Sequence, residues 1–245
     1  MNNKRVILPN LFTVGNLLCG FIAIIKVHEG HFVSASWLIV LAAFLDAFDG
    51  KIARFTKTFS SFGVEFDSMA DLVSCGVAPA YLAYALYFHT WGTVGVLVSF
   101  LFVLAAAFRL ARFNVLAEAD HKDKFYGMPV PLSAGTLVTW VIFMYDVWGG
   151  FRFGPILLTL MLMLPMLMVS RVRYETFPKL TFADSRENNI KVAIMLGMGC
   201  LVAVDPGKAM FICAFGTVMF GLTRAIIQHF TEPEDDEVVD VTVTE

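Results

Sequence analysis

Residues 32–54 read FVSASWLIVLAAFLDAFDGKIAR, an apolar run that acquires two aspartates and two cations only near its end. A helix that crosses the hydrocarbon core of a bilayer needs about 20 predominantly apolar residues. The stretch has that length, and its charges gather at one end. It therefore predicts a transmembrane helix whose polar end reaches the membrane interface.

The rest of the chain follows the same pattern. Its 245 residues are 58% hydrophobic and 16% charged, with a mean hydropathy of +0.71. A soluble domain carries roughly 25% charged residues, so the composition indicates a membrane protein. We expect an all-α, polytopic membrane helix bundle of about eight transmembrane helices. The candidate spans are 8–27, 32–54, 68–88, 93–117, 129–148, 153–171, 190–205 and 208–230.

The distribution of cations predicts the orientation of this bundle, because cytoplasmic connections are enriched in lysine and arginine. With a cytoplasmic N-terminus, all but three of the 18 Lys and Arg residues fall on the inner side; the exceptions are Lys26, Arg152 and Lys208. The asymmetry supports an even number of spans and two cytoplasmic termini. It also argues for keeping the weak seventh span, which Gly197 and Gly199 interrupt.

The chain divides into a membrane domain, residues 1–230, and an acidic tail, residues 231–245. The tail lacks helical periodicity, so we expect it to be disordered. The N-terminal apolar stretch is interpreted as a retained helix, since no signal-peptide cleavage site follows it. The four cysteines form no C-x-x-C pair and predict no disulfide framework.

Four aspartates carry the candidate chemistry. Asp46 and Asp49 are three residues apart, and Asp67 and Asp71 are four apart, so each pair shares one face of its helix. The two helices are consecutive and antiparallel, which predicts that the pairs meet near the inner interface. Four carboxylates in a partly dehydrated site need a counter-charge, and all-oxygen ligands favour Mg²⁺ or Mn²⁺. Two such ions suit a displacement at phosphorus.

The neighbouring residues fit a phosphate ligand. Gly50 and Ala53 leave room for a diphosphate to approach the backbone, and Arg54 is able to neutralise a phosphate. An aspartate at a helix end is more often a cap or a solvated charge, but four at these spacings make that interpretation weak. A cation-coupled transporter would place its carboxylates near mid-membrane and would often show an internal repeat. Here the carboxylates are predicted near the inner interface, and the sequence shows no internal repeat. There is also no P-loop, Rossmann glycine pattern or nucleophilic Ser or Cys motif.

The pattern Asp46-x-x-Asp49-Gly50-x-x-Ala53-Arg54-x8-Gly63-x-x-x-Asp67-x-x-x-Asp71 resembles the signature of the CDP-alcohol phosphotransferases, with every position present. Three further stretches resemble the bacterial members of that family that use L-serine. They are LPNLFTVGNLLCGF (8–21), DLVSCGVAPA (71–80), and FRLARFN (108–114) with GMPVP (127–131). The resemblance covers residues 5–135 well and the remainder only as a hydrophobic pattern.

This resemblance implies transfer of the phosphatidyl group from CDP-diacylglycerol to L-serine, which gives phosphatidylserine and CMP. It implies that two Mg²⁺ or Mn²⁺ ions are held by Asp46, Asp49, Asp67 and Asp71, and that Asp71 is also the general base. The implied CDP-lipid site consists of Asn10, Thr13, Gly50, Ala53, Arg54 and Gly63. The resemblance further implies a homodimer in a bacterial-type inner membrane, surrounded by membrane lipids, with its site facing the cytoplasm. We expect no nucleic-acid partner.

Three polar residues near the inner end of the fourth span are candidates for binding the acceptor. Arg109 and Arg112 share a helix face, and Asn114 follows them. An arginine there is able to bind the serine carboxylate bidentately, although snorkelling to lipid headgroups explains the pair equally well. Glycerol phosphate and inositol phosphate also attract cations, so both remain alternative acceptors within the same family. A non-catalytic scaffold is a further alternative.

Overall fold

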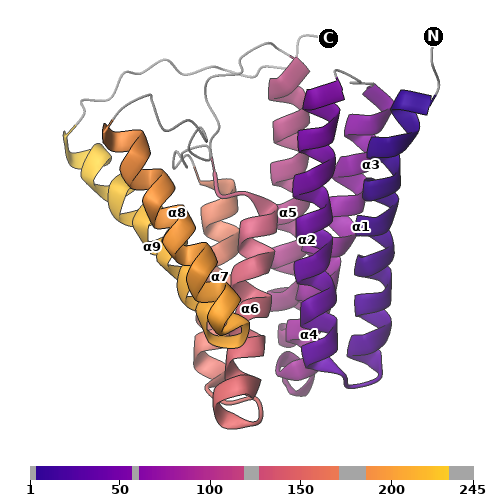
Figure 1. Cartoon of the computed structure of the whole chain (residues 1–245). Coiled ribbons are helices and arrows are strands. Elements are labelled where there is room, and N and C mark those ends of the chain that lie inside the picture. The colour runs from indigo at the N-terminus through magenta and orange to yellow at the C-terminus, as the bar shows by residue number, and fades with distance from the viewer. Residues whose placement is uncertain (1–3, 57–60, 119–126, 171–185, 232–245) are drawn as a thin grey trace.

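The computed structural model describes residues 4–56, 61–118, 127–170 and 186–231 (Figure 1). These four ranges are almost entirely helical and contain no strand, which confirms the all-α prediction. The α-helices are α1 (Lys4–His28), α2 (Phe32–Thr56), α3 (Ser61–Asp71), α4 (Ala78–Leu86), α5 (Thr93–Glu118), α6 (Val130–Trp148), α7 (Gly154–Val169), α8 (Arg186–Val204) and α9 (Pro206–Thr231).

Two short elements interrupt this series. A π-helix, η1 (Leu72–Val77), joins α3 to α4, and a 3₁₀ turn, η2 (Phe88–Trp91), leads towards α5. The segment from α3 to α4 therefore runs as one rod with a widened turn in its middle. Successive rods alternate in direction, and α1 begins at the same end of the bundle at which α9 ends (Figure 1).

Six helical stretches are long and apolar enough to cross a membrane: Leu11–His28, Phe32–Lys51, Phe62–Leu86, Thr93–Val115, Val130–Trp148 and Pro206–Thr223. Each corresponds to a predicted span, which indicates an integral membrane protein. The predicted span 153–171 falls on α7, an apolar helix shorter than these six. The predicted span 190–205 falls on α8, whose first side chains lie outside the part that the structure describes. The 16 residues of α7 rise about 24 Å, short of a hydrocarbon core of about 30 Å. The count of eight and the orientation therefore stay predictions.

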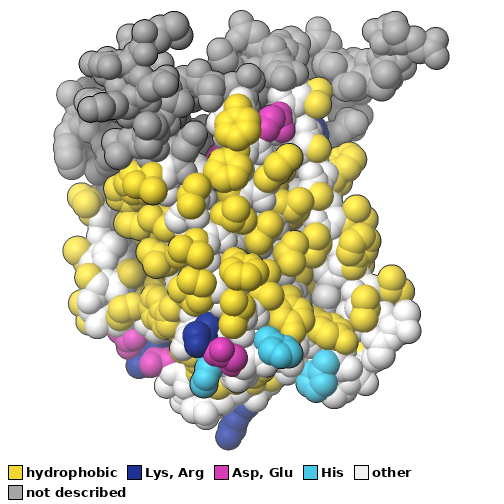
Figure 2. Space-filling view, turned by 90° about the vertical axis from the view of Figure 1, so that its right-hand side faces the viewer, with side chains coloured by type: hydrophobic (Ala, Val, Ile, Leu, Met, Phe, Trp, Pro, Cys, Tyr) yellow, Lys and Arg dark blue, Asp and Glu magenta, His cyan; other side chains and the backbone are white. Residues whose placement is uncertain are grey.

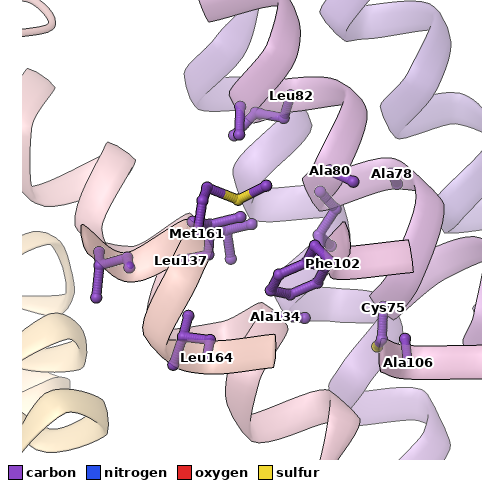
Figure 3. Close-up of a cluster of buried hydrophobic side chains, with 14 of the residues drawn as sticks. Cys75, Ala78, Ala80, Leu82, Phe102, Ala106, Ala134, Leu137, Met161 and Leu164 are labelled. Carbon is purple, nitrogen blue, oxygen red and sulfur yellow. The ribbon is translucent and has the colours of Figure 1, made fainter. Parts of the chain in front are cut away.

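The core lies between α4, α5, α6 and α7, where small side chains let the helices approach closely. Figure 3 shows this cluster, which includes Cys75, Ala78, Ala80, Leu82, Phe102, Ala106, Ala134, Leu137, Met161 and Leu164. The alanines supply the close approach, and the larger residues fill the space between helix axes. Ala35 and Ile39 of α2 belong to the same core, which ties the helix that carries Asp46 and Asp49 to the bundle.

The outer surface is apolar over most of its height. On the face shown in Figure 2, hydrophobic side chains cover the middle of the molecule, and charged and histidine side chains gather at one end. Among the described residues, large apolar side chains such as Leu18, Phe21 and Phe44 are exposed. A monomeric soluble protein rarely exposes so extensive an apolar patch. Contact with lipid acyl chains accounts for it.

The predicted acidic tail begins at Thr231, which the structure shows as the last residue of α9. The remainder of that tail, residues 232–245, lies outside the described residues.

Candidate active site

Three carboxylates from two helices meet near the end of α2. Asp46 and Asp49 of α2 and Asp67 of α3 each offer one oxygen, and these three oxygens lie within 4.8 Å of one another. Asp49 is only 5% exposed, and the other two are half-buried. The helical spacing of the aspartates brings the pairs together because α2 and α3 are antiparallel neighbours.

Asp71 completes this acidic cluster. It is the last residue of α3, it is 6% exposed, and its charge acts on both Asp46 and Asp67. The π-helix η1 begins at the next residue, and single π turns within helices are frequent at functional sites. We call Asp46, Asp49, Asp67 and Asp71 the acidic cluster from here on.

Helix α1 supplies two hydrogen-bond donors to the acidic cluster. Thr13 Oγ1 donates to Asp49 Oδ2 at 2.9 Å, and Asn16 Nδ2 donates to Asp71 Oδ1 at 2.8 Å. Both donors are buried. We predicted that Thr13 contacts the nucleotide or diphosphate, and the structure places its hydroxyl on a carboxylate.

Asn16 was missed by the sequence analysis. A signal was present, because Asn16 lies three residues after Thr13 and so shares its helix face. It is a polar residue in the interior of an apolar span, where an unsatisfied amide is costly. Such a residue needs a polar partner, and the sequence offered no means of choosing which one.

Arg109 of α5 lies beside the acidic cluster. Its guanidinium interacts electrostatically with Asp71 and Asp46, and it lies 5.9 Å from the centre of the Phe113 ring. Its Nε atom is buried and has no hydrogen-bond partner among the described residues. Arg112 is half-buried one turn further along α5. The structure thus brings one predicted acceptor-binding cation next to the candidate base.

Asn114 is engaged elsewhere. Its amide nitrogen donates to Ser68 Oγ at 3.1 Å and to Glu65 Oε2 at 3.3 Å, and its oxygen accepts from Ser68 Oγ at 3.2 Å. These bonds fasten α5 to α3. In this structure the predicted acceptor ligand Asn114 therefore acts as a link between helices.

The remaining predicted residues lie along the same helices. Gly50 directly follows Asp49 on α2, and Gly63 lies one turn before Asp67 on α3. Three more, Asn10, Ala53 and Arg54, belong to α1 and α2, but their side chains lie outside the part that the structure describes. Their predicted contacts with a CDP-lipid stay predictions.

The donor set fits divalent cations. The acidic cluster offers only carboxylate oxygens, and Asp67 Oδ1 is buried without a hydrogen-bond partner among the described residues. The hydroxyl of Thr13 and the amide of Asn16 satisfy single oxygens but carry no charge. Arg109 supplies one positive charge against four carboxylates. Hard cations such as Mg²⁺ or Mn²⁺ would balance the rest.

Comparisons with known proteins extend over the whole site. The sequence model of the CDP-alcohol phosphatidyltransferase family matches residues 6–220. The CDP-diacylglycerol–serine O-phosphatidyltransferase of Helicobacter pylori is 36% identical over 225 residues, which cover 91% of this chain and 92% of the relative. The enzyme of the same name from Bacillus subtilis is 36% identical over 173 residues, covering 70% and 92%. The archaetidylserine synthase of Methanothermobacter thermautotrophicus is 32% identical over 180 residues, covering 71% and 73%.

Proposed function

This chain belongs to the CDP-alcohol phosphatidyltransferase family, and we propose that it transfers the phosphatidyl group of CDP-diacylglycerol to L-serine. Two of its relatives are named CDP-diacylglycerol–serine O-phosphatidyltransferase, and the region that matches the family model, residues 6–220, includes the acidic cluster. The observation that carries the proposal is the meeting of four buried or half-buried carboxylates from two helices beside Arg109.

The reaction is a displacement at the lipid-linked phosphorus. The serine hydroxyl oxygen attacks that phosphorus and forms the new P–O bond, while the bond to the CMP oxygen breaks and CMP leaves. Asp71 accepts the hydroxyl proton as general base. One of its oxygens receives the Asn16 amide, and the other remains for the proton.

The acidic cluster would hold two Mg²⁺ or Mn²⁺ ions. When bound, such ions stabilise negative charge on the attacking and leaving oxygens of a phosphoryl displacement. The chain's own part is to fix the ligands. Thr13 and Asn16 orient one carboxylate on each acidic helix, and burial keeps bulk water away from Asp49 and Asp71.

Arg109 is the residue we propose for the serine carboxylate. A guanidinium binds a carboxylate through two parallel hydrogen bonds, and the unpartnered Nε of Arg109 is one available donor. Arg112 is a second candidate, since it lies one turn away on α5. Glycerol phosphate and inositol phosphate, as acceptors, remain the alternative.

The site would face the cytoplasm of a bacterial-type inner membrane. The excess of lysine and arginine on one side of the predicted spans supports this orientation, because the acidic cluster lies towards the same end. The homodimer implied by the family resemblance also stays a prediction.

An acceptor panel tests the function. Purified protein in detergent is given CDP-diacylglycerol, Mg²⁺ or Mn²⁺, and one of L-serine, glycerol 3-phosphate or inositol phosphate, and CMP release is measured. We expect release with serine and only background with the others. Release driven by one of the phosphorylated acceptors would move the chain to another branch of the family, and no release with any acceptor would reject the proposal.

A further inference from the structure

The side chain of Asn16 makes a contact that the reaction scheme above does not require. Its Nδ2 lies 2.8 Å from Asp71 Oδ1, although the two residues are 55 positions apart. Asn16 is fully buried, and its own Oδ1 has no hydrogen-bond partner among the described residues. Because an ionised carboxylate only accepts hydrogen bonds, the amide must present its NH₂ group to Asp71.

We propose that Asn16 is a positioning residue that holds the Asp71 carboxylate in the orientation needed for phosphatidyl transfer. The inference rests on the proposed function, because it assigns Asn16 a role only through Asp71. Asn16 itself is too deeply buried to touch a substrate in this structure.

The backbone geometry supports a fixed distance between the two residues. One turn after Asn16, α1 lies close against η1: a Cβ atom added at Gly20 would lie 2.6 Å from Ser74 Cα. Only glycine permits this approach. Ser74 in turn lies three residues after Asp71, so the Gly20–Ser74 contact and the Asn16–Asp71 hydrogen bond belong to the same helix crossing.

A second hydrogen bond joins α1 to the other acidic helix, α2. Thr13, three residues before Asn16, donates to Asp49 of α2 at 2.9 Å. One face of α1 thus reaches both acidic helices, one carboxylate on each. The first helix therefore sets the relative position of the two halves of the acidic cluster.

The chemical need for a holding group follows from the crowding of like charges. Asp71 stands near Asp46 and Asp67, and mutual repulsion favours rotation of its carboxylate away from them. A hydrogen bond to one oxygen fixes the side-chain torsion and leaves the second oxygen directed at the reaction. Such supporting contacts around catalytic carboxylates and metal ligands are commonly worth 10–100-fold in activity or metal affinity.

The test is a double-mutant cycle between Asn16 and Asp71. Asn16→Leu keeps the side-chain size and removes the donor. At saturating Mg²⁺ we expect it to lower kcat for serine-dependent CMP release by about 10–100-fold while KM for CDP-diacylglycerol changes little. In the Asp71→Asn background the same change should have no further effect on the residual rate, because the group through which Asn16 acts is already lost.

Two further variants separate loss of the hydrogen bond from misfolding and from a general effect of changing a buried polar residue. Asn16→Ala removes the same donor without branched bulk, so it preserves the test if Asn16→Leu fails to fold. Ser36→Ala is the matched control, since Ser36 is a fully buried polar residue of α2 whose hydroxyl donates to the Phe32 carbonyl, at 2.9 Å. We expect Ser36→Ala to retain the wild-type kcat.

Two outcomes overturn the inference: a wild-type kcat in folded Asn16→Leu or Asn16→Ala, or an equal fold-loss in the wild-type and Asp71→Asn backgrounds. The second result would mean that Asn16 contributes only packing. Failure of the proposed function looks different, since the wild-type protein itself would then release no CMP with serine.

Discussion

Two groups of aspartates lie towards opposite ends of the bundle and differ in how their charge is balanced (Figure 1). At the end where α8 meets α9, Lys208 Nζ lies 2.8 Å from Asp205 Oδ2 and 3.6 Å from Asp146 Oδ2. At the other end, the acidic cluster receives one hydroxyl and one amide from α1, and Arg109 is a cation beside it.

The difference distinguishes carboxylates that are paired within the chain, such as Asp205, from the acidic cluster, whose carboxylates need a cation ligand. Asp205 is satisfied within the chain, and the hydrogen bond from Lys208 holds its pKa below the ordinary value. Because the Asp205 side chain is exposed to solvent, water would stabilise its carboxylate almost as well as Lys208 does. The acidic cluster is buried or half-buried, and its four carboxylates outnumber the cations beside it among the described residues, so we expect cations from outside the chain to balance it.

Among the tests of this difference between the two groups of aspartates, removal of divalent cations should have the largest effect on activity. Chelation by excess EDTA is expected to reduce serine-dependent CMP release to the level of a protein-free blank, and added Mg²⁺ or Mn²⁺ should restore it. The control is a second chelated sample that receives the same buffer without divalent cations. Serine incorporation that continues unchanged in EDTA would contradict a role for cations at the acidic cluster.

Asp71→Asn should have the next largest effect. The amide keeps the size of the side chain but cannot accept the hydroxyl proton, so kcat should fall by at least about 100-fold. Binding of CDP-diacylglycerol, measured separately by retention of labelled lipid, should change less. A variant with wild-type turnover would remove Asp71 from the role of base.

Thr13→Val tests the α1 contact to the other acidic helix. Loss of the hydroxyl leaves Asp49 without its 2.9 Å donor, so the Mg²⁺ concentration for half-maximal activity should rise about 10-fold. Thr136→Val is the matched control, because Thr136 is also buried and its hydroxyl donates within α6, to the Leu132 carbonyl at 2.8 Å. Equal Mg²⁺ curves for Thr13→Val and Thr136→Val would show that the contact does not support the cation ligands.

Lys208→Met, at the opposite end, should have the smallest effect. We expect an unchanged kcat and only a slight fall in the temperature of thermal inactivation, since exposed ion pairs contribute little. Because the folded-state pKa of Asp205 is depressed, its contribution is present at neutral pH and is lost as the pH falls through that pKa. The difference between variant and wild type should therefore shrink in acid, and a large drop in kcat at neutral pH would contradict the contrast.

The sequence predicted the residues of the acidic cluster better than it predicted their hydrogen-bond partners. Helical spacing alone places Asp46 with Asp49 and Asp67 with Asp71, and a short connection makes their helices antiparallel neighbours. The partners of those carboxylates depend on how α1 crosses α3 and η1. A crossing is a tertiary property, so Asn16 and the engagement of Asn114 by Ser68 were not foreseen.

Hydropathy located the spans but not every helix end. The third span was predicted to begin at residue 68, whereas α3 begins at Ser61. Its first turns carry Glu65 and Asp67, which lower the local hydropathy although the backbone is helical. Apolar run length likewise cannot show that α7 ends at Val169.

The π turn has a consequence for how the third rod tolerates change. It lies between two surfaces with different tasks: Asp67 and Asp71 before it and the alanine-rich packing face of α4 after it. Removing or adding one residue there would rotate one surface against the other by about 100°, the angle per residue of an α-helix. Insertions and deletions within Leu72–Val77 should thus be selected against even where single substitutions are accepted.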